Sequence, residues 1–288
     1  MHEDDRASVV VMSRDRRDEL LTSLPRHRAP VVLVDNGSVD GSASAVRSAM
    51  PGVTVVRLPA DVGSQARNIG VARARTPFVA FADDDSWWSP GSLHEGAELL
   101  AEHPRLAAVV ARVLVGVDEA EDPMVQALRT SPLTGAGLPG PRVLGFMACA
   151  TMVRREAFLA VGGFDPLVRF PGEEEPLALR LAAAGWDIVY VDALVVHHHP
   201  SPRRAAPGTR TAQIARSATT SALLVLPWRT VARRAVGLAR AGRWERRGLL
   251  RALPTVVPAL RRRRVVPRRV RRDLDRLARA ARTRSSTA

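Results

Sequence analysis

The sequence has no lysine, one cysteine and no long uninterrupted hydrophobic run. The single cysteine, Cys149, excludes an internal disulfide. No N-terminal stretch combines a basic start with an apolar core, so we expect no secretory leader. The apolar run around residues 221–228 is too short to cross a bilayer, so we expect no transmembrane helix. These absences favour a cytoplasmic protein that is at most peripheral at the inner face of the plasma membrane.

Charge is distributed unevenly along the 288 residues. Residues 203–288 hold 24 arginines against three acids, whereas residues 1–202 hold 19 arginines against 26 acids. With 46% hydrophobic residues, the acidic part can bury the core of one large domain. The sequence therefore predicts an acidic domain followed by an arginine-rich tail.

The acidic part alternates between β-branched runs and helix-like segments, which is typical of an α/β fold with a mainly parallel sheet. In such sheets, ligands bind beyond the carboxyl ends of the strands. The expected strands are 7–12, 30–34, 52–58 and 78–82, and the expected helices between them are 42–49 and 65–74.

Three consecutive aspartates, Asp83 to Asp85, directly follow the apolar run 78–82. Like charges packed this closely repel one another unless a cation neutralises them, so the cluster indicates a divalent metal. Alternatively, one aspartate caps the next helix and the others face water. Asp35 follows the strand 30–34 and so reaches the same sheet edge, where it could accept a hydrogen bond from a nucleotide base or simply close a turn.

Six motifs in order resemble those of the inverting family 2 glycosyltransferases, from about residue 7 to about residue 200. Each motif is weak by itself, but their shared order and spacing are specific. They are Ser8-Val-Val-Val, Asp35-Asn-Gly-Ser-Val-Asp-Gly-Ser, Gly63-x-x-Ala-Arg-Asn-x-Gly70, Phe81-Ala-Asp-Asp-Asp85, Gly162-Gly-Phe-Asp165 and Gly172-Glu-Glu-Glu-Pro-Leu-Ala-Leu-Arg180.

The resemblance implies a GT-A fold, in which a mainly parallel central sheet carries flanking helices. It implies a domain over residues 1–202, with a nucleotide-binding half at about 7–90 and an acceptor half at about 91–202. Residues 203–288 then form a basic helical extension. Family members move a sugar from a nucleotide diphosphate sugar, usually with Mn²⁺ or Mg²⁺.

The resemblance also implies roles for the donor-binding residues. Asp35 is expected to bind the base with Arg67 nearby, and Asp83 to touch the ribose or the donor sugar. Asp85 is expected to bind the metal that bridges the diphosphate. Asp84 occupies the variable middle position of the Asp-x-Asp pattern, as a donor contact or only a spacer.

Inversion requires a base that deprotonates the acceptor hydroxyl, and a carboxylate suits that role. The family places it in a Glu-Asp pair, which this chain replaces with Gly-Glu-Glu-Glu-Pro over residues 172–176. The register of the following helix puts Glu174 at the base position, with Glu173 as the second candidate. Alternatively, the acids only stabilise the N-terminus of a helix that has Pro176 in its first turn.

Three adjacent histidines follow the last expected strand. His197 is the natural register for a third metal ligand or a diphosphate contact, and His199 is the alternative. An exposed polar turn before Pro200 is an equally simple interpretation.

Two segments carry no catalytic motif. Residues 116–145 lack periodicity and predict a flexible loop over the acceptor site. The tail alternates arginine with apolar residues, which predicts amphipathic basic helices that can lie on an anionic membrane surface. Nucleic-acid binding is disfavoured because Trp228 and Trp244 are the tail's only aromatic residues. A solvated helical face is the third interpretation.

These observations favour a metal-dependent inverting glycosyltransferase acting on a cell-envelope glycan or a lipid-linked acceptor. The alternative from another class is a non-catalytic protein that binds nucleotide sugars or a membrane surface, with the triple glutamate marking lost activity. A nucleotidyltransferase is disfavoured because residues 12–17 supply arginines but no glycine for a triphosphate loop. The sequence identifies neither the donor sugar nor the acceptor.

Overall fold

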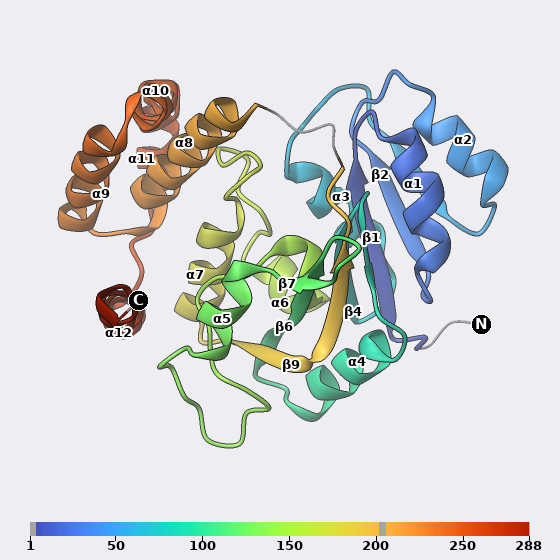
Figure 1. The fold of residues 1–288 in the computed structure, drawn as a ribbon, viewed down its shortest axis with the longest axis horizontal. Coiled ribbons are helices and arrows are strands. Elements are labelled where there is room, and N and C mark those ends of the chain that lie inside the picture. The colour runs from blue at the N-terminus through green and yellow to red at the C-terminus, as the bar shows by residue number, and fades with distance from the viewer. Residues whose placement is uncertain (1–3, 202–205, 288) are drawn as a thin grey trace.

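The computed structural model describes residues 4–201 and 206–287. Within these residues one nine-stranded sheet runs in the order β3-β2-β1-β4-β8-β6-β9-β5, with β7 paired to β6 (Figure 1). The strands are β1 (Ala7–Ser13), β2 (Val31–Asp35), β3 (Thr54–Arg57), β4 (Phe78–Asp83), β5 (Ser86–Trp88), β6 (Leu106–Val115), β7 (Ala120–Glu121), β8 (Thr151–Arg154) and β9 (Asp187–His198).

Helices pack around this sheet and extend beyond it at the C-terminus. In chain order the α-helices are α1 (Arg17–Ser23), α2 (Ser42–Ala49), α3 (Gln65–Arg73), α4 (Ser92–Glu102), α5 (Pro123–Arg129), α6 (Arg155–Ala160), α7 (Glu174–Ala184), α8 (Pro207–Val225), α9 (Trp228–Ala241), α10 (Arg243–Ala252), α11 (Val256–Arg261) and α12 (Arg268–Thr287). Short 3₁₀ turns occur at Leu24–Arg26, Ala148–Ala150 and Leu253–Thr255.

The first four strands are parallel, as their β-branched sequences and helical connections predict. Their register places Ser13 beside Asp35, and Met12 beside Asp83. The two acidic motifs therefore meet at one carboxyl edge of the sheet. The expected strands and the helices between them are confirmed, with boundaries that shift by one or two residues.

The second half of the sheet mixes orientations. Strand β8 is antiparallel to both β4 and β6, whereas β6 and β9 are parallel. The short strand β5 follows the aspartate cluster and pairs with the end of β9, so that Ser86 opposes His198. This pairing brings the triple-histidine segment next to the aspartates.

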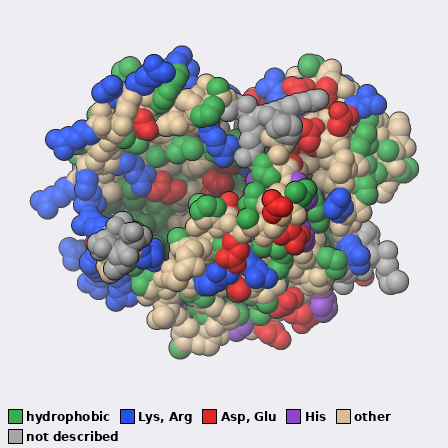
Figure 2. Space-filling model, viewed as in Figure 1, with side chains coloured by type: hydrophobic (Ala, Val, Ile, Leu, Met, Phe, Trp, Pro, Cys, Tyr) green, Lys and Arg blue, Asp and Glu red, His purple; other side chains and the backbone are tan. Residues whose placement is uncertain are grey.

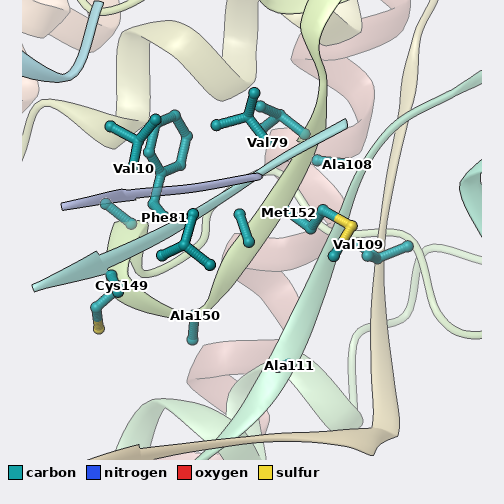
Figure 3. Close-up of a cluster of buried hydrophobic side chains, with 14 of the residues drawn as sticks. Val10, Val79, Phe81, Ala108, Val109, Ala111, Cys149, Ala150 and Met152 are labelled. Atoms are coloured by element: carbon teal, nitrogen blue, oxygen red, sulfur yellow. The ribbon is translucent and has the colours of Figure 1, made fainter. Parts of the chain in front are cut away.

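The core lies where the two halves of the sheet meet. Figure 3 shows Val10 of β1, Phe81 of β4 and Met152 of β8 in one apolar cluster, with Cys149 near its edge. All three hydrophobic side chains are fully buried. Burial of this kind stabilises the fold by roughly 1.5–3 kcal/mol for each large side chain.

The segment 116–145 is less irregular than its lack of periodicity predicted. It contains β7 and the helix α5. The side chain of Asp122 accepts a hydrogen bond from the Met124 backbone N–H, and Pro123 occupies the first helical turn. This capping pattern starts the short helix without an amphipathic repeat.

The arginine-rich tail is helical, and it packs on the α/β domain. Leu179 of α7 belongs to a second apolar cluster with Leu224 of α8 and Ala259 of α11. Arg234 of α9 forms a bidentate ion pair with Glu175 of α7, with both N···O distances at 2.7 Å. The expected boundary between residues 202 and 203 lies outside the described residues. No helix among the described residues is long and apolar enough to span a membrane.

Candidate functional site

A cavity of about 700 Å³ opens at the carboxyl edge of the sheet. Its wall combines the ends of β1 and β4 with the start of α7, the end of β9 and one side of α8. The charged side chains that line it include Arg67, the three aspartates 83–85, Glu174 and His198. The structure therefore brings together five of the eight site residues that the sequence predicts.

Arg67 is the central cation of this site. Its side chain is 1% exposed, and its two terminal nitrogens donate to Glu173 Oε1 and Asp83 Oδ1, each at 2.6 Å. Burial would lower the pKa of the guanidinium, but the nearby carboxylates of Asp83, Glu173 and Glu174 raise it above its usual value. Arg67 thus links α3 to β4 and to the residue before α7 through two ion pairs of its buried guanidinium, an arrangement that we call the Arg67 clamp.

Replacing Arg67 with alanine is expected to destabilise the protein by about 3–5 kcal/mol, because Glu173 then remains buried without its cation. Denaturant unfolding followed by circular dichroism measures the change. Arg73 lies exposed on the same helix, and Arg73→Ala should change stability by less than about 0.5 kcal/mol. Equal losses in the two variants would contradict the clamp.

Asp84 is held inside the cavity wall. Its Oδ2 accepts a hydrogen bond from Ser13 Oγ at 2.8 Å. Burial, followed by the charge of Asp83, raises the pKa of its carboxyl to about 7. Asp84 is therefore held by a contact to the end of β1 as well as by its place in the cluster.

Asp85 contacts the segment that follows β9. Its Oδ1 lies 3.3 Å from His198 Nε2, and its Oδ2 accepts from the Ser201 backbone N–H at 2.9 Å. The backbone N–H of His199 donates to the Asp85 carbonyl at 2.8 Å. These contacts join the end of the aspartate cluster to the histidine segment.

His197, the metal ligand that the sequence predicts, contacts residues outside the aspartate cluster. Its Nε2 lies 2.6 Å from Ser89 Oγ and its Nδ1 2.8 Å from Glu119 Oε1. Its ring stacks on Trp87 with centroids 5.4 Å apart. Consecutive side chains on a strand point to opposite faces, so the β5–β9 register turns His198 to the cavity in place of His197.

The donor set of the cavity fits a divalent cation. Asp85 offers a carboxylate oxygen and His198 an imidazole nitrogen, a combination that Mn²⁺ accepts. The raised pKa of Asp84 marks a site where added positive charge stabilises the ionised carboxylates. An ion held by two protein ligands would keep positions for substrate phosphates, as is usual for Mg²⁺.

A second group with metal-like spacing lies at the amino end of β1. Ligand atoms of Asp4, His94 and Glu98 lie within 4.8 Å of one another. Arg6 donates hydrogen bonds to both Asp4 and Glu98. This guanidinium already supplies the positive charge that the group needs, and the group lies outside the cavity.

The three consecutive glutamates point in three directions. Glu173 is fully buried against Arg67, and Glu175 pairs with Arg234. Glu174 alone of the three lines the cavity, where Ala148 N–H lies 3.4 Å from its Oε1. Burial, followed by the charge of Glu173, raises the pKa of Glu174 to about 8.

Asp35 is buried beside the cavity residue Asn36 and does not itself line the cavity. Its side chain is 1% exposed, and its Oδ1 accepts from the Ser38 backbone N–H at 2.9 Å. Its neighbour Asn36 lines the cavity and donates to Asp61 Oδ1 at 2.8 Å. Asn36 and Asp61 also line an adjoining cavity of about 420 Å³, together with Arg14.

Sequence reasoning missed several of these wall residues. Asp61 follows the third strand, and its place after a strand end was the available signal. Arg210, Gln213 and Ile214 of α8 also line the larger cavity. No local signal marks them, because their position depends on how α8 packs on the domain.

Comparisons with known proteins place the chain among sugar-transferring enzymes. The family model for Glycosyl transferase family 2 matches residues 8–162. The chain is 30% identical over 206 residues to the N-acetylglucosaminyl-diphospho-decaprenol L-rhamnosyltransferase of Mycobacterium tuberculosis, covering 59% of this chain and 66% of that protein. It is 36% identical over 201 residues to the pre-mycofactocin glycosyltransferase of the same organism, covering 64% and 40%. The matches thus span less than two thirds of each relative.

Solved structures confirm the predicted fold. The mannosyltransferase PcManGT from Pyrobaculum calidifontis, in complex with GDP-Man and Mn²⁺, superposes with a TM-score of 0.57 at 20% identity, covering 89% of this chain and 74% of that one. S. aureus TarS 1-349 gives a TM-score of 0.59 at 18% identity, covering 92% and 82%. At this identity the likeness shows the GT-A fold alone.

Proposed function

The chain belongs to glycosyltransferase family 2, and we propose that it moves a sugar from a nucleotide diphosphate sugar to an acceptor hydroxyl with inversion. One observation carries the proposal. Glu174, whose pKa is raised to about 8, lines the same cavity as the Asp83–Asp85 cluster, and Arg67 neutralises the buried Glu173 behind it. This arrangement supports separate roles in one cavity, with Glu174 as the proton acceptor and the aspartate cluster as the group that binds a cation.

Mn²⁺ or Mg²⁺, held by Asp85 and His198, would neutralise the charge that accumulates on the departing nucleoside diphosphate. Asp83 is oriented by Arg67 and is proposed to contact the ribose or the donor sugar. Arg210 adds a guanidinium to the cavity wall, which suits a diphosphate.

Glu174 is proposed to take the proton from the acceptor hydroxyl. A carboxylate with a raised pKa is a stronger base than an ordinary glutamate once it is ionised. Its place at the start of α7 holds it on a rigid element, and Glu173 and Glu175 are tied to Arg67 and Arg234 on either side.

The nucleotide base is proposed to occupy the adjoining cavity of about 420 Å³. Asn36 and Asp61 offer an amide and a carboxylate there, and Arg14 lines both cavities. Asp35 then supports the base site through the turn that it closes with Ser38.

A lipid-linked saccharide is the acceptor that we propose. The rhamnosyltransferase relative is named for an acceptor of this kind. The pre-mycofactocin relative is named for a different acceptor, so acceptor identity requires a direct test.

The proposal is tested by incubating the protein with Mn²⁺ and UDP-, GDP- or dTDP-sugars and measuring nucleotide release with and without lipid-linked saccharides. We expect release with one donor class and a product that carries the sugar. Binding of a donor without release under any condition would favour the non-catalytic alternative. Absence of both binding and release would overturn the proposal.

A further inference from the structure

An exposed apolar stripe runs along the near-continuous helical segment of α10, the 3₁₀ turn 253–255 and α11. It consists of Leu250, Leu253, Val257 and Leu260, which are 66%, 62%, 58% and 40% exposed. Their spacing of three, four and three residues places them on one face of the helical segment. Large apolar side chains grouped in this way indicate an interaction surface.

The opposite face of the same segment is fixed against the protein. Gly248 approaches α8 so closely that an added Cβ would lie 2.5 Å from the Ala212 carbonyl oxygen. Thr255 Oγ1 forms a 2.9 Å hydrogen bond with Thr220 Oγ1 of α8, and Ala259 is fully buried. The stripe therefore cannot turn inward without breaking this packing.

Arginines surround the stripe. The exposed arginines on the same segment and just after it include Arg246, Arg247, Arg251, Arg261 and Arg262. Figure 2 shows Lys and Arg side chains, all of them arginine in this chain, gathered over the C-terminal helices at the left of the view. The segment 203–288 holds 24 arginines and three acids, so its field attracts anions.

We propose that the apolar stripe and its arginines dock the protein on the surface of an anionic phospholipid bilayer. The leucines enter the boundary between headgroups and acyl chains, and the guanidiniums contact lipid phosphates. A nucleic acid would use the arginines but not the leucines. A second copy of the chain would bring two strongly positive surfaces together, which opposes dimerisation through this face.

Docking of this kind would place the cavity close to the lipid. Helix α8 presents Ala212 and Ala215 to α10, and Arg210 and Gln213 to the cavity. Packed helices lie about 8–10 Å apart, and two helical layers, the α10–α11 segment and α8, lie between the docking face and the cavity. The docking proposal goes beyond the proposed sugar transfer and does not depend on it.

Co-sedimentation of the full chain with vesicles tests the proposal. We expect binding to vesicles of phosphatidylcholine with phosphatidylglycerol and much weaker binding to phosphatidylcholine alone. The double variant Leu250→Ser/Leu253→Ser should bind anionic vesicles roughly tenfold or more weakly. Arg246→Gln/Arg247→Gln should also weaken binding, by roughly fivefold for each arginine.

Val39→Ser is the matched control, because Val39 is 90% exposed and precedes α2, on the opposite side of the molecule from α10 in Figure 1. It should bind as the unaltered protein does. Circular dichroism checks that each variant is folded. The proposal would be overturned if the double leucine variant bound anionic vesicles as tightly as the unaltered protein does. It would also be overturned if vesicles were not bound while DNA was bound tightly by both the unaltered protein and the leucine variant. A dimer that the leucine changes dissociate in the absence of lipid would overturn it as well.

Discussion

Replacing Glu174 with glutamine is expected to lower kcat by about 10²–10⁴-fold, because the amide cannot accept the acceptor proton. Donor affinity should change little, since the glutamine side chain keeps the size of Glu174 and the aspartate cluster is unaltered. Steady-state kinetics and donor titration measure the two effects separately. Glu175→Gln is the matched control, because Glu175 pairs with Arg234 and does not line the cavity. Full activity in the Glu174 variant, or an equal loss in the control, would refute the base assignment.

The pH dependence of kcat/KM should follow the ionisation of Glu174. Glu174 acts in its ionised form, and its pKa is raised to about 8 by burial and by the charge of Glu173. The kcat/KM of the protein is therefore expected to rise about tenfold per pH unit below this value and to level off above it. A profile that is already flat at pH 6 would show that another group takes the proton.

The glutamine variant should also be more stable at alkaline pH. In the unfolded chain the carboxyl loses its proton near 4.5, whereas in the folded protein it keeps the proton up to about 8. Between these values the unfolded state binds fewer protons, so stability falls as pH rises, by up to about 1.4 kcal/mol per unit. Urea unfolding should show Glu174→Gln more stable than the unaltered protein at pH 8, with a much smaller difference at pH 5.

Replacing Asp85 with asparagine is expected to lower turnover by about 10³-fold, since a cation in such a site contributes several kcal/mol to charge stabilisation. Direct Mn²⁺ titration by calorimetry should show weakened binding even without donor. His198→Ala should weaken Mn²⁺ binding as well, because its Nε2 lies beside Asp85.

Two control variants test whether the loss of Mn²⁺ binding is specific to Asp85 and His198. Asp118 is exposed in the turn after β6, and Asp118→Asn should leave both turnover and Mn²⁺ affinity unchanged. His197→Ala removes the ring that bonds Ser89 and Glu119, so it should affect Mn²⁺ binding less than His198→Ala. A larger effect of His197→Ala would instead identify His197 as the metal ligand.

Local patterns were sufficient to predict the first half of the sheet and the family. Runs such as residues 31–34 can bury both faces only between helices, so their strand state depends little on distant contacts. The position of Asp83 at the end of a buried strand likewise follows from the chain itself. The capped helix in 116–145 was missed, because one aspartate and one proline leave no hydrophobic repeat.

The sequence by itself determined the fold class, the sheet edge that carries the acids, and the helical state of the arginine-rich tail. The register of the helix that follows the glutamates already favoured Glu174 over Glu173 as the base. Only the tertiary structure gave the physical reason, because packing buries Glu173 against Arg67 and leaves Glu174 in the cavity wall. Only the tertiary structure decided between His197 and His198, whose faces depend on the β5–β9 register.

The Asp83–Asp85 cluster shows the limit of local information most clearly. Its charge could be read along the chain, but Arg67, Ser13 and His198 reach it from α3, β1 and β9. The same holds for the tail, whose arginines were evident from the sequence, whereas the placement of α8 in the cavity wall was not. Contacts between residues far apart in the chain are decided by packing, and no short window of sequence contains them.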